Sequence, residues 1–212
     1  MISPRLSREN IVAVAIEMAD EEGLASVTLR GIAARLAVHV TSLYNHVPTK
    51  EAVISAMVEA LLAEARLPTG RIDWETWVRR FAAAMRALAH EHPGAFEAFH
   101  HGPARGEAAA GPFESGFAAF RAAGFDSATT YNATKAVVVA VLGYMLEDTL
   151  TARKKDVART DIRGLPIERF PQLHSINRVA GKTDTFAYLV EMLIAGIAAT
   201  RGDRSRRKRI PD

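Results

Sequence analysis

One stretch limits the fold of this sequence more than any other: residues 27 to 50, VTLRGIAARLAVHVTSLYNHVPTK. Thr28 is a favourable N-cap residue, and apolar residues then recur at helical spacing up to Leu36, which predicts a first helix of about two turns. Residues 37–39 interrupt this pattern. A second apolar set follows until Pro48 ends it, because the residue before a proline is pushed out of helical geometry. Two short helices joined by a tight turn are typical of a helix-turn-helix.

The predicted second helix carries an unusual set of side chains for an exposed surface. They are short or planar hydrogen-bonding groups with no long acid among them: His39, Thr41, Ser42, Tyr44, Asn45 and His46. Such groups match base edges in the major groove of DNA, where Val40 can also touch a thymine methyl group. Tyr44, Lys50 and Arg30 can reach phosphates, and Thr28 completes the predicted DNA-binding set. The alternative is an ordinary helical hairpin, but its solvated face usually carries Glu and Lys.

Three segments, TLRGIAARLAV, TSLYNHV and PTKEAV, resemble the DNA-binding domain of the tetracycline-repressor (TetR) family of regulators. The resemblance covers roughly the first 66 residues. It implies an all-α fold, in which a three-helix DNA-binding domain precedes a helical ligand-binding and dimerisation domain. Many members have glycine in the turn where this chain has Ala37, and we expect Ala37 to keep a right-handed backbone.

Composition excludes several classes of protein. The chain has no cysteine, which rules out disulfides, thiol chemistry and Cys-ligated zinc and fits a reducing cytoplasm. Its N-terminus lacks a signal segment, and its longest uncharged apolar run, residues 136–146, is too short to span a bilayer. We therefore expect a soluble cytoplasmic protein with no membrane partner.

The net charge of +3 comes from the C-terminal tail, residues 201–212, which holds six Arg/Lys against two Asp. Residues 1–200 carry a net charge of −1. A prediction of DNA binding therefore depends on where charges lie in the helix-turn-helix and not on bulk charge. We expect the tail itself to be disordered and solvated.

The spacing of apolar residues, caps and breakers divides the chain into four parts. They are a DNA-binding domain (1–48), a connecting helix (49–67), a ligand-binding and dimerisation domain (68–200) and the basic tail (201–212). The predicted helices of the third part span residues 74–90, 95–101, 112–123, 127–152 and 186–199, with a loop at 102–111 and an irregular connection at 153–182.

Two of these helices, 127–152 and the one within 184–200, are apolar on nearly every side of their middle. Such helices must be buried all round. One core does not explain both in a small domain, so we expect a homodimer through these two helices, with a four-helix interface.

The third part resembles the regulatory domain of the tetracycline repressors themselves, through WETWVRRF, VLGYMLED and FAYLVEMLIAGI. In that subfamily a histidine and an acidic residue lie at a drug–metal site. Glu147 falls on the matching motif, but His100 and His101 are displaced from the family position. The resemblance thus implies a ligand-binding body, while this departure counts against tetracycline with magnesium as the ligand.

Aromatic residues with a few polar neighbours suggest where a flat apolar ligand would bind. The predicted ligand-binding residues are Phe96, Phe99, His100, Phe117, Tyr144 and Glu147. The alternative is that the aromatic residues only form the core.

We interpret the chain as a DNA-binding transcriptional regulator, a repressor released from a palindromic operator by a small-molecule effector. One alternative is a metal-dependent enzyme or binding protein that uses the histidines His90, His92, His100 and His101. No pair of them has the i, i+4 spacing of a metalloenzyme helix motif, so solvated histidines are the simpler interpretation. Another alternative is a non-specific architectural DNA protein. We expect no catalytic residues, no cofactor and no metal ligands.

Overall fold

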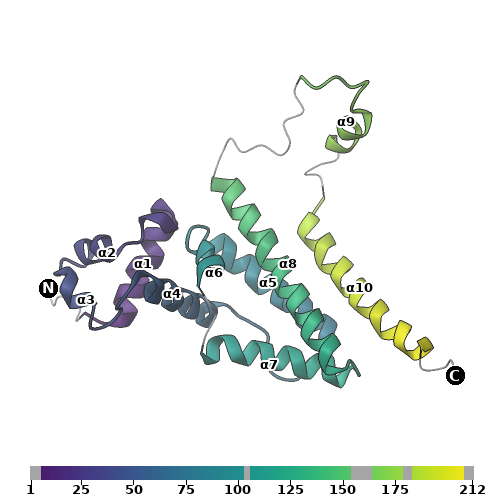
Figure 1. The fold of residues 1–212 in the computed structure, drawn as a ribbon, viewed down its shortest axis with the longest axis horizontal. Helices are drawn as coiled ribbons and strands as arrows, with labels where there is room; N and C mark the ends of the chain where they lie inside the picture. The colour runs from purple at the N-terminus through teal and green to yellow at the C-terminus, as the bar shows by residue number, and fades with distance from the viewer. Residues whose placement is uncertain (1–5, 103–105, 154–163, 179–182, 208–212) are drawn as a thin grey trace. The chain divides into compact units, whose positions relative to one another are not determined.

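The computed structural model describes residues 6–102, 106–153, 164–178 and 183–207, which fall into two compact units, 1–149 and 150–212. Every regular element among these residues is helical, as Figure 1 shows, so the all-α prediction is confirmed. Within the described ranges, no helix is both long and apolar enough to cross a membrane.

The first unit begins with the helices of the head, which we define as residues 7–64. They are α1 (Arg8–Glu22), η1 (Leu24–Ser26), α2 (Leu29–Arg35), α3 (Val40–Leu43) and α4 (Lys50–Glu64). The body of this unit contains α5 (Trp74–Glu91), η2 (Ala95–Glu97), α6 (Ala98–His101), α7 (Glu107–Ala122) and α8 (Ser127–Arg153), the last of which crosses into the second unit. The second unit contains α9 (Pro171–Asn177) and α10 (Thr185–Arg207).

Side-chain caps explain where the head helices start. The hydroxyl groups of Ser7, Thr28 and Thr49 each accept a hydrogen bond from the backbone amide three residues further on, at 3.2, 3.0 and 3.1 Å. Each bond satisfies an amide that has no partner within its helix. The predicted start of α2 at Thr28 is therefore confirmed, and Ser7 and Thr49 fix the starts of α1 and α4 in the same way.

Helix α4 connects the head to the body within the first unit. It packs against α1 and also against α6 and α7, and Figure 1 shows it next to the purple N-terminal helices. Its buried side chains Val53, Met57 and Leu61 recur at spacings of four along the helix. One helix thus contributes to the packing of both parts.

Helix α7 begins earlier than predicted. We expected a loop up to residue 111 and a start at Pro112, but the helix begins at Glu107 and holds Pro112 inside it. Alanine is the best helix former, and Ala108 to Ala110 precede the proline. Pro112 lies in the second turn, where it lacks the N–H that would bond to the carbonyl of Ala108 and where its ring crowds that carbonyl.

The second unit also differs from expectation. Helix α10 continues to Arg207, so residues 201–207 of the predicted disordered tail are helical, since adding residues to an existing helix is easier than starting one. Residues 208–212 lie outside the described ranges. Helix α9 lies within the connection that we predicted to be irregular, of which residues 154–163 and 179–182 are not described.

Candidate functional site

The turn between α2 and α3 has an unexpected backbone conformation. Ala37 has a φ of 54°, which is left-handed, so the expectation of a right-handed residue is wrong. Two backbone hydrogen bonds explain this conformation. The amide of Ala37 donates to the carbonyl of Ala34 at 3.2 Å, and the amide of Val38 donates to the carbonyl of Ala33 at 3.0 Å. This closure of α2 places an L-residue where glycine would be unstrained.

Two buried side chains hold the segment from α3 to α4 in place. Leu43 and Val47 are almost completely buried, and Ile32 of α2 is buried with them. By contrast, Tyr44, between the first two in sequence, is 52% exposed. The segment from Val40 to Lys50 therefore has an apolar inner side and a polar outer side. We call the outer side the recognition surface.

The predicted DNA-binding residues all reach the surface, and none of them is buried. The exposed ones are Thr28, Arg30, His39, Thr41, Tyr44, Asn45 and His46. The half-buried ones are Val40, Ser42 and Lys50. This placement brings most of the set onto consecutive residues of one short segment.

Two members of the set also have a structural task. Thr28 caps α2, and His39 is the N-cap of α3, with its Nδ1 accepting the Thr41 amide at 3.4 Å. The same nitrogen lies 2.7 Å from the Thr41 hydroxyl oxygen. Sequence reasoning assigned His39 only to base contacts and missed this capping role.

Charges in the head differ in their availability. Arg35 pairs with Glu21 and Glu22 at 2.6 and 2.7 Å, and these hydrogen-bonded carboxylates raise its pKa. Arg30 forms no ion pair with any described residue and is exposed. Arg30 is therefore the cation of α2 that remains available to a phosphate.

Asp20 joins α1 to the body. Its Oδ1 accepts hydrogen bonds from the amides of Gly94 and Ala95 at 2.9 and 2.8 Å, and its Oδ2 lies 2.7 Å from His92 Nδ1. The other ring nitrogen of His92 lies 3.1 Å from Glu64 Oε1 at the end of α4. Partial burial of His92 opposes protonation, but the hydrogen bonds to both carboxylates outweigh it and raise the pKa of the imidazole.

An apolar cavity lies inside the body of the first unit, with a volume of about 60 Å³. Its walls come from α4, the segment after it, and α5 to α8: Leu62, Leu67, Trp77, Phe81, Met85, Phe99, Ala109, Pro112, Phe113, Val138 and Leu142. The Trp77 indole is fixed by a bond from Nε1 to the carbonyl of Pro112 at 3.1 Å and by stacking on Phe81. We call this space the inner cavity.

A larger hollow of about 330 Å³ shares Phe99 and Leu142 with the inner cavity. Its lining is Phe96, Phe99, His100, Val139, Leu142, Gly143 and Leu146. Volumes of about 300–1,000 Å³ are typical of small-molecule sites, so this outer hollow is large enough for a ligand. His100 is the one polar side chain in its lining.

The structure brings together half of the predicted ligand-binding set. Phe96, Phe99 and His100 line the outer hollow, whereas Phe117, Tyr144 and Glu147 lie outside the lining of both spaces. Glu147 is exposed. Sequence reasoning placed Trp77 and Met85 within the predicted helix 74–90 but did not assign them to a cavity.

The four histidines of the alternative site lie in different surroundings. His90 is 3.8 Å from Asp148, His101 is 3.7 Å from Glu97, and His92 faces the carboxylates named above. Within the described ranges, the single group of at least three metal-ligating side chains contains His92 but none of the other three histidines. The geometry thus does not favour a metal centre built from the four.

Comparisons with known proteins agree with this geometry. Residues 11–57 match the family model "Bacterial regulatory proteins, tetR family", and residues 67–201 match "Tetracyclin repressor-like, C-terminal domain". An HTH-type transcriptional regulator of Saccharopolyspora erythraea is 32% identical over 94% of this chain and 87% of its own length.

Two further proteins extend the likeness. The tetracycline repressor protein class D of Escherichia coli is 30% identical over 80% of this chain and 77% of its own length. The crystal structure of a TetR variant from Acinetobacter baumannii AYE, in complex with minocycline, is 26% identical with a TM-score of 0.72, covering 93% of this chain and 99% of the other. Both family models and the curated relatives lead to one identification: the chain is a member of the tetR family of bacterial regulatory proteins.

Proposed function

We propose that this protein is a ligand-responsive transcriptional repressor that binds double-stranded DNA through the recognition surface. The observation that carries the proposal is the pairing of exposed polar side chains from Thr41 to His46 with the buried Leu43 beneath them. A surface held rigidly by its own core presents donors and acceptors to base edges without having to order them first.

We assign DNA contacts to individual residues of this surface, and to Arg30 on the neighbouring helix α2, from their exposure and their chemistry. Thr41, Ser42 and Asn45 would contact base edges, whereas Tyr44, Lys50 and Arg30 would contact phosphates. Arg30 suits this role because it has no ion pair among the described residues. Phosphate contacts fix the position of the protein, and base contacts select the sequence.

A symmetric dimer completes the proposal. Val139 on α8 is 57% exposed, and Tyr188 and Met192 on α10 are exposed as well. We propose that these helices form the interface with a second copy, as in a four-helix arrangement. Two recognition surfaces about 34 Å apart would then require a palindromic operator.

The effector would occupy the outer hollow and the inner cavity. Their walls are apolar and aromatic, and His100 is part of the lining of the outer hollow, which suits a flat, largely apolar molecule with one hydrogen-bonding group. Leu62 of α4 lines the inner cavity, so a ligand there would act directly on the helix that packs against α1. A ligand with higher affinity for a state in which α4 has moved would release DNA by a population shift.

The proposal includes a cytoplasmic location, where bacterial DNA is found, and no enzymatic activity. Both parts are supported by the relatives, which are transcriptional regulators. A steady turnover of any small molecule by the purified protein would contradict this part.

Selection of random duplex DNA on the purified protein tests the DNA-binding proposal. We expect enrichment of a palindrome, and a loss of affinity of about 10- to 100-fold in Thr41→Ala or Asn45→Ala, because a good base contact contributes about 1–3 kcal/mol. Thr69→Ala is the matched control, since Thr69 is exposed in the segment after α4. Equal affinities of all three variants and the parent for the selected site would contradict the assignment of the recognition surface.

A further inference from the structure

Three helices of the first unit end close to one imidazole ring. Glu64 is the last residue of α4, Glu91 is the last residue of α5, and Asp20 lies in the last turn of α1. The C-terminal ends of helices carry partial negative charge, so they add to the charge of these carboxylates. None of the described lysines or arginines pairs with any of the three. The place therefore has an excess of negative charge around His92.

His92 is oriented as a metal ligand would be. Asp20 Oδ2 lies 2.7 Å from Nδ1, so a proton on that nitrogen has an acceptor and Nε2 is left to bind a cation. Metal-binding histidines usually donate their other ring N–H to a carboxylate in this way. Nε2 points toward Glu64, with Oε1 at 3.1 Å.

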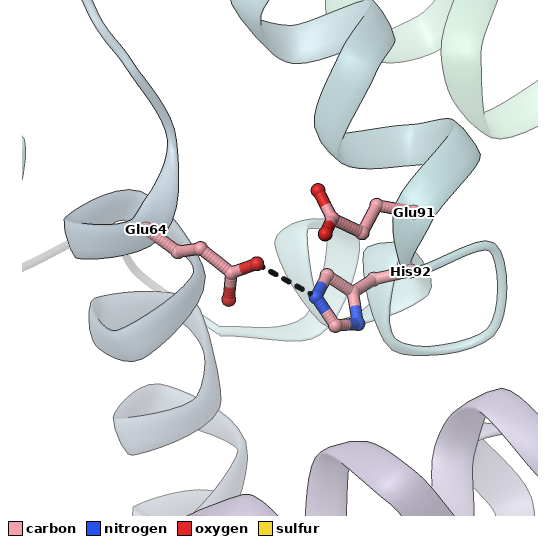
Figure 2. A group of neighbouring side chains, drawn as sticks. All are labelled: Glu64, Glu91 and His92. Atoms are coloured by element: carbon pink, nitrogen blue, oxygen red, sulfur yellow. Dashed lines mark hydrogen bonds and ion pairs between the residues drawn. The ribbon is translucent and has the colours of Figure 1, made fainter.

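Glu91 supplies a second carboxylate near the imidazole ring of His92. One ligand atom each from Glu64, Glu91 and His92 lie within 4.8 Å of one another, and Figure 2 shows both carboxylates turned toward the ring. Ligand atoms of a tetrahedral zinc ion with bonds of about 2.0–2.2 Å lie about 3.3 Å apart. The separation between His92 and Glu64 already fits this geometry. Glu91 is exposed and has no hydrogen bond or ion pair with another described residue, so it can rotate to complete the set.

We propose that His92, Glu64 and Glu91 form a binding site for a divalent transition metal of the zinc class, with Asp20 orienting the imidazole. A water molecule would take the fourth position, because the three side chains leave one side of a tetrahedron open. An imidazole with carboxylates suits zinc, whereas magnesium prefers oxygen ligands throughout. The ion would link the end of α4 to the end of α5. This site goes beyond the proposed repressor activity and does not depend on it.

Titration calorimetry with zinc chloride tests the proposal on the full chain, purified without a histidine tag and stripped with a chelator. We expect one ion per chain, no binding of magnesium chloride, and a higher thermal unfolding temperature when zinc is present. Glu91→Gln should weaken zinc binding by about tenfold or more, and Asp20→Asn by about 10- to 100-fold through loss of the oriented ring.

Two variants keep the test decisive. Glu91→Gln should fold as the parent does, because its carboxylate makes no contact of this kind among the described residues. His101→Gln is the matched control, since His101 also faces a carboxylate, that of Glu97 at 3.7 Å. Unchanged zinc affinity in Glu91→Gln, loss of binding in His101→Gln, or no stoichiometric binding by the parent would each overturn the proposal.

Discussion

The recognition surface and the wall of the inner cavity use their side chains in opposite ways. Polar groups of the recognition surface point outward, and only the residues between them, such as Leu43, contribute to packing. In the cavity wall, Trp77 and Met85 are buried, so the same side chains that face the cavity also form the core. Substitutions of exposed groups that cap no helix, such as Tyr44, should therefore change binding alone, whereas substitutions in the cavity wall should change stability and binding together.

The strongest test of this contrast uses two neighbours in the head. Leu43→Ala should lower the free energy of unfolding by about 2–5 kcal/mol, because it leaves a cavity under the recognition surface. Tyr44→Ala should change it by no more than about 0.5 kcal/mol, because the tyrosine is exposed, yet it should weaken DNA binding. Urea unfolding and operator titration on the same samples measure both effects. A large loss of stability in Tyr44→Ala would break the comparison.

In the body, the close approach of Gly116 to the Trp77 ring of the cavity wall can be tested. A Cβ atom added at Gly116 of α7 would lie 2.6 Å from the Trp77 ring, which its hydrogen bond and stacking hold in place. Gly116→Ala should therefore cost about 1–3 kcal/mol of overpacking, only partly offset by better helix propensity. Gly143→Ala is the matched control, because a Cβ there meets nothing within 4 Å. Similar unfolding midpoints in urea for the two variants would refute the close approach.

In the turn between α2 and α3, we expect a smaller change of opposite sign, a gain in the free energy of unfolding. Ala37→Gly should raise the free energy of unfolding by about 0.5–1 kcal/mol, because relief of the left-handed strain exceeds the extra entropy of an unfolded glycine. The same exchange at Ala34, within the right-handed helix α2, should lower it by about 0.5–1 kcal/mol. Thermal unfolding of both variants checks the signs, and a loss in each would show that Ala37 is not strained.

The smallest effect concerns the start of α5 in the body. Asp73 caps this helix, and hydrogen bonds from Thr76, chiefly from its backbone amide, lower the pKa of the carboxyl group. A lowered pKa in the folded state stabilises the protein above the ordinary aspartate pKa of about 3.9, and this contribution is lost as pH falls through the folded value. Asp73→Asn should be slightly less stable near neutral pH and equal to the parent in acid. A difference that does not vary with pH would contradict the charged cap.

Local signals explain which parts of the fold could be predicted. Ser7, Thr28 and Thr49 each cap a helix through an amide only three residues further on, and a signal this local made the cap at Thr28 predictable. The recognition surface is equally local, because its residues follow one another in the chain. Ala37 was misjudged because its backbone is set by the closure of α2 and not by its own preference.

The cavity and the cluster around His92 depend on tertiary structure. The inner cavity takes its wall from six helical or connecting segments, and no spacing in the sequence reveals which apolar faces converge. Asp20 and His92 are 72 residues apart in the chain. Sequence reasoning grouped the four histidines by proximity along the chain, whereas the structure gives His90, His92 and His101 different carboxylate partners and places His100 in the lining of the outer hollow.

The packing of α4 against α1, α6 and α7 has a consequence for how the protein opens. A helix shared in this way makes the head and the adjoining body a single cooperative unit, because neither keeps its full set of buried contacts without the other. Backbone amides in α1 and α5 should then exchange with solvent through the same opening event and with similar protection. For the same reason, a fragment cut after α4 should lose the native protection of its amides.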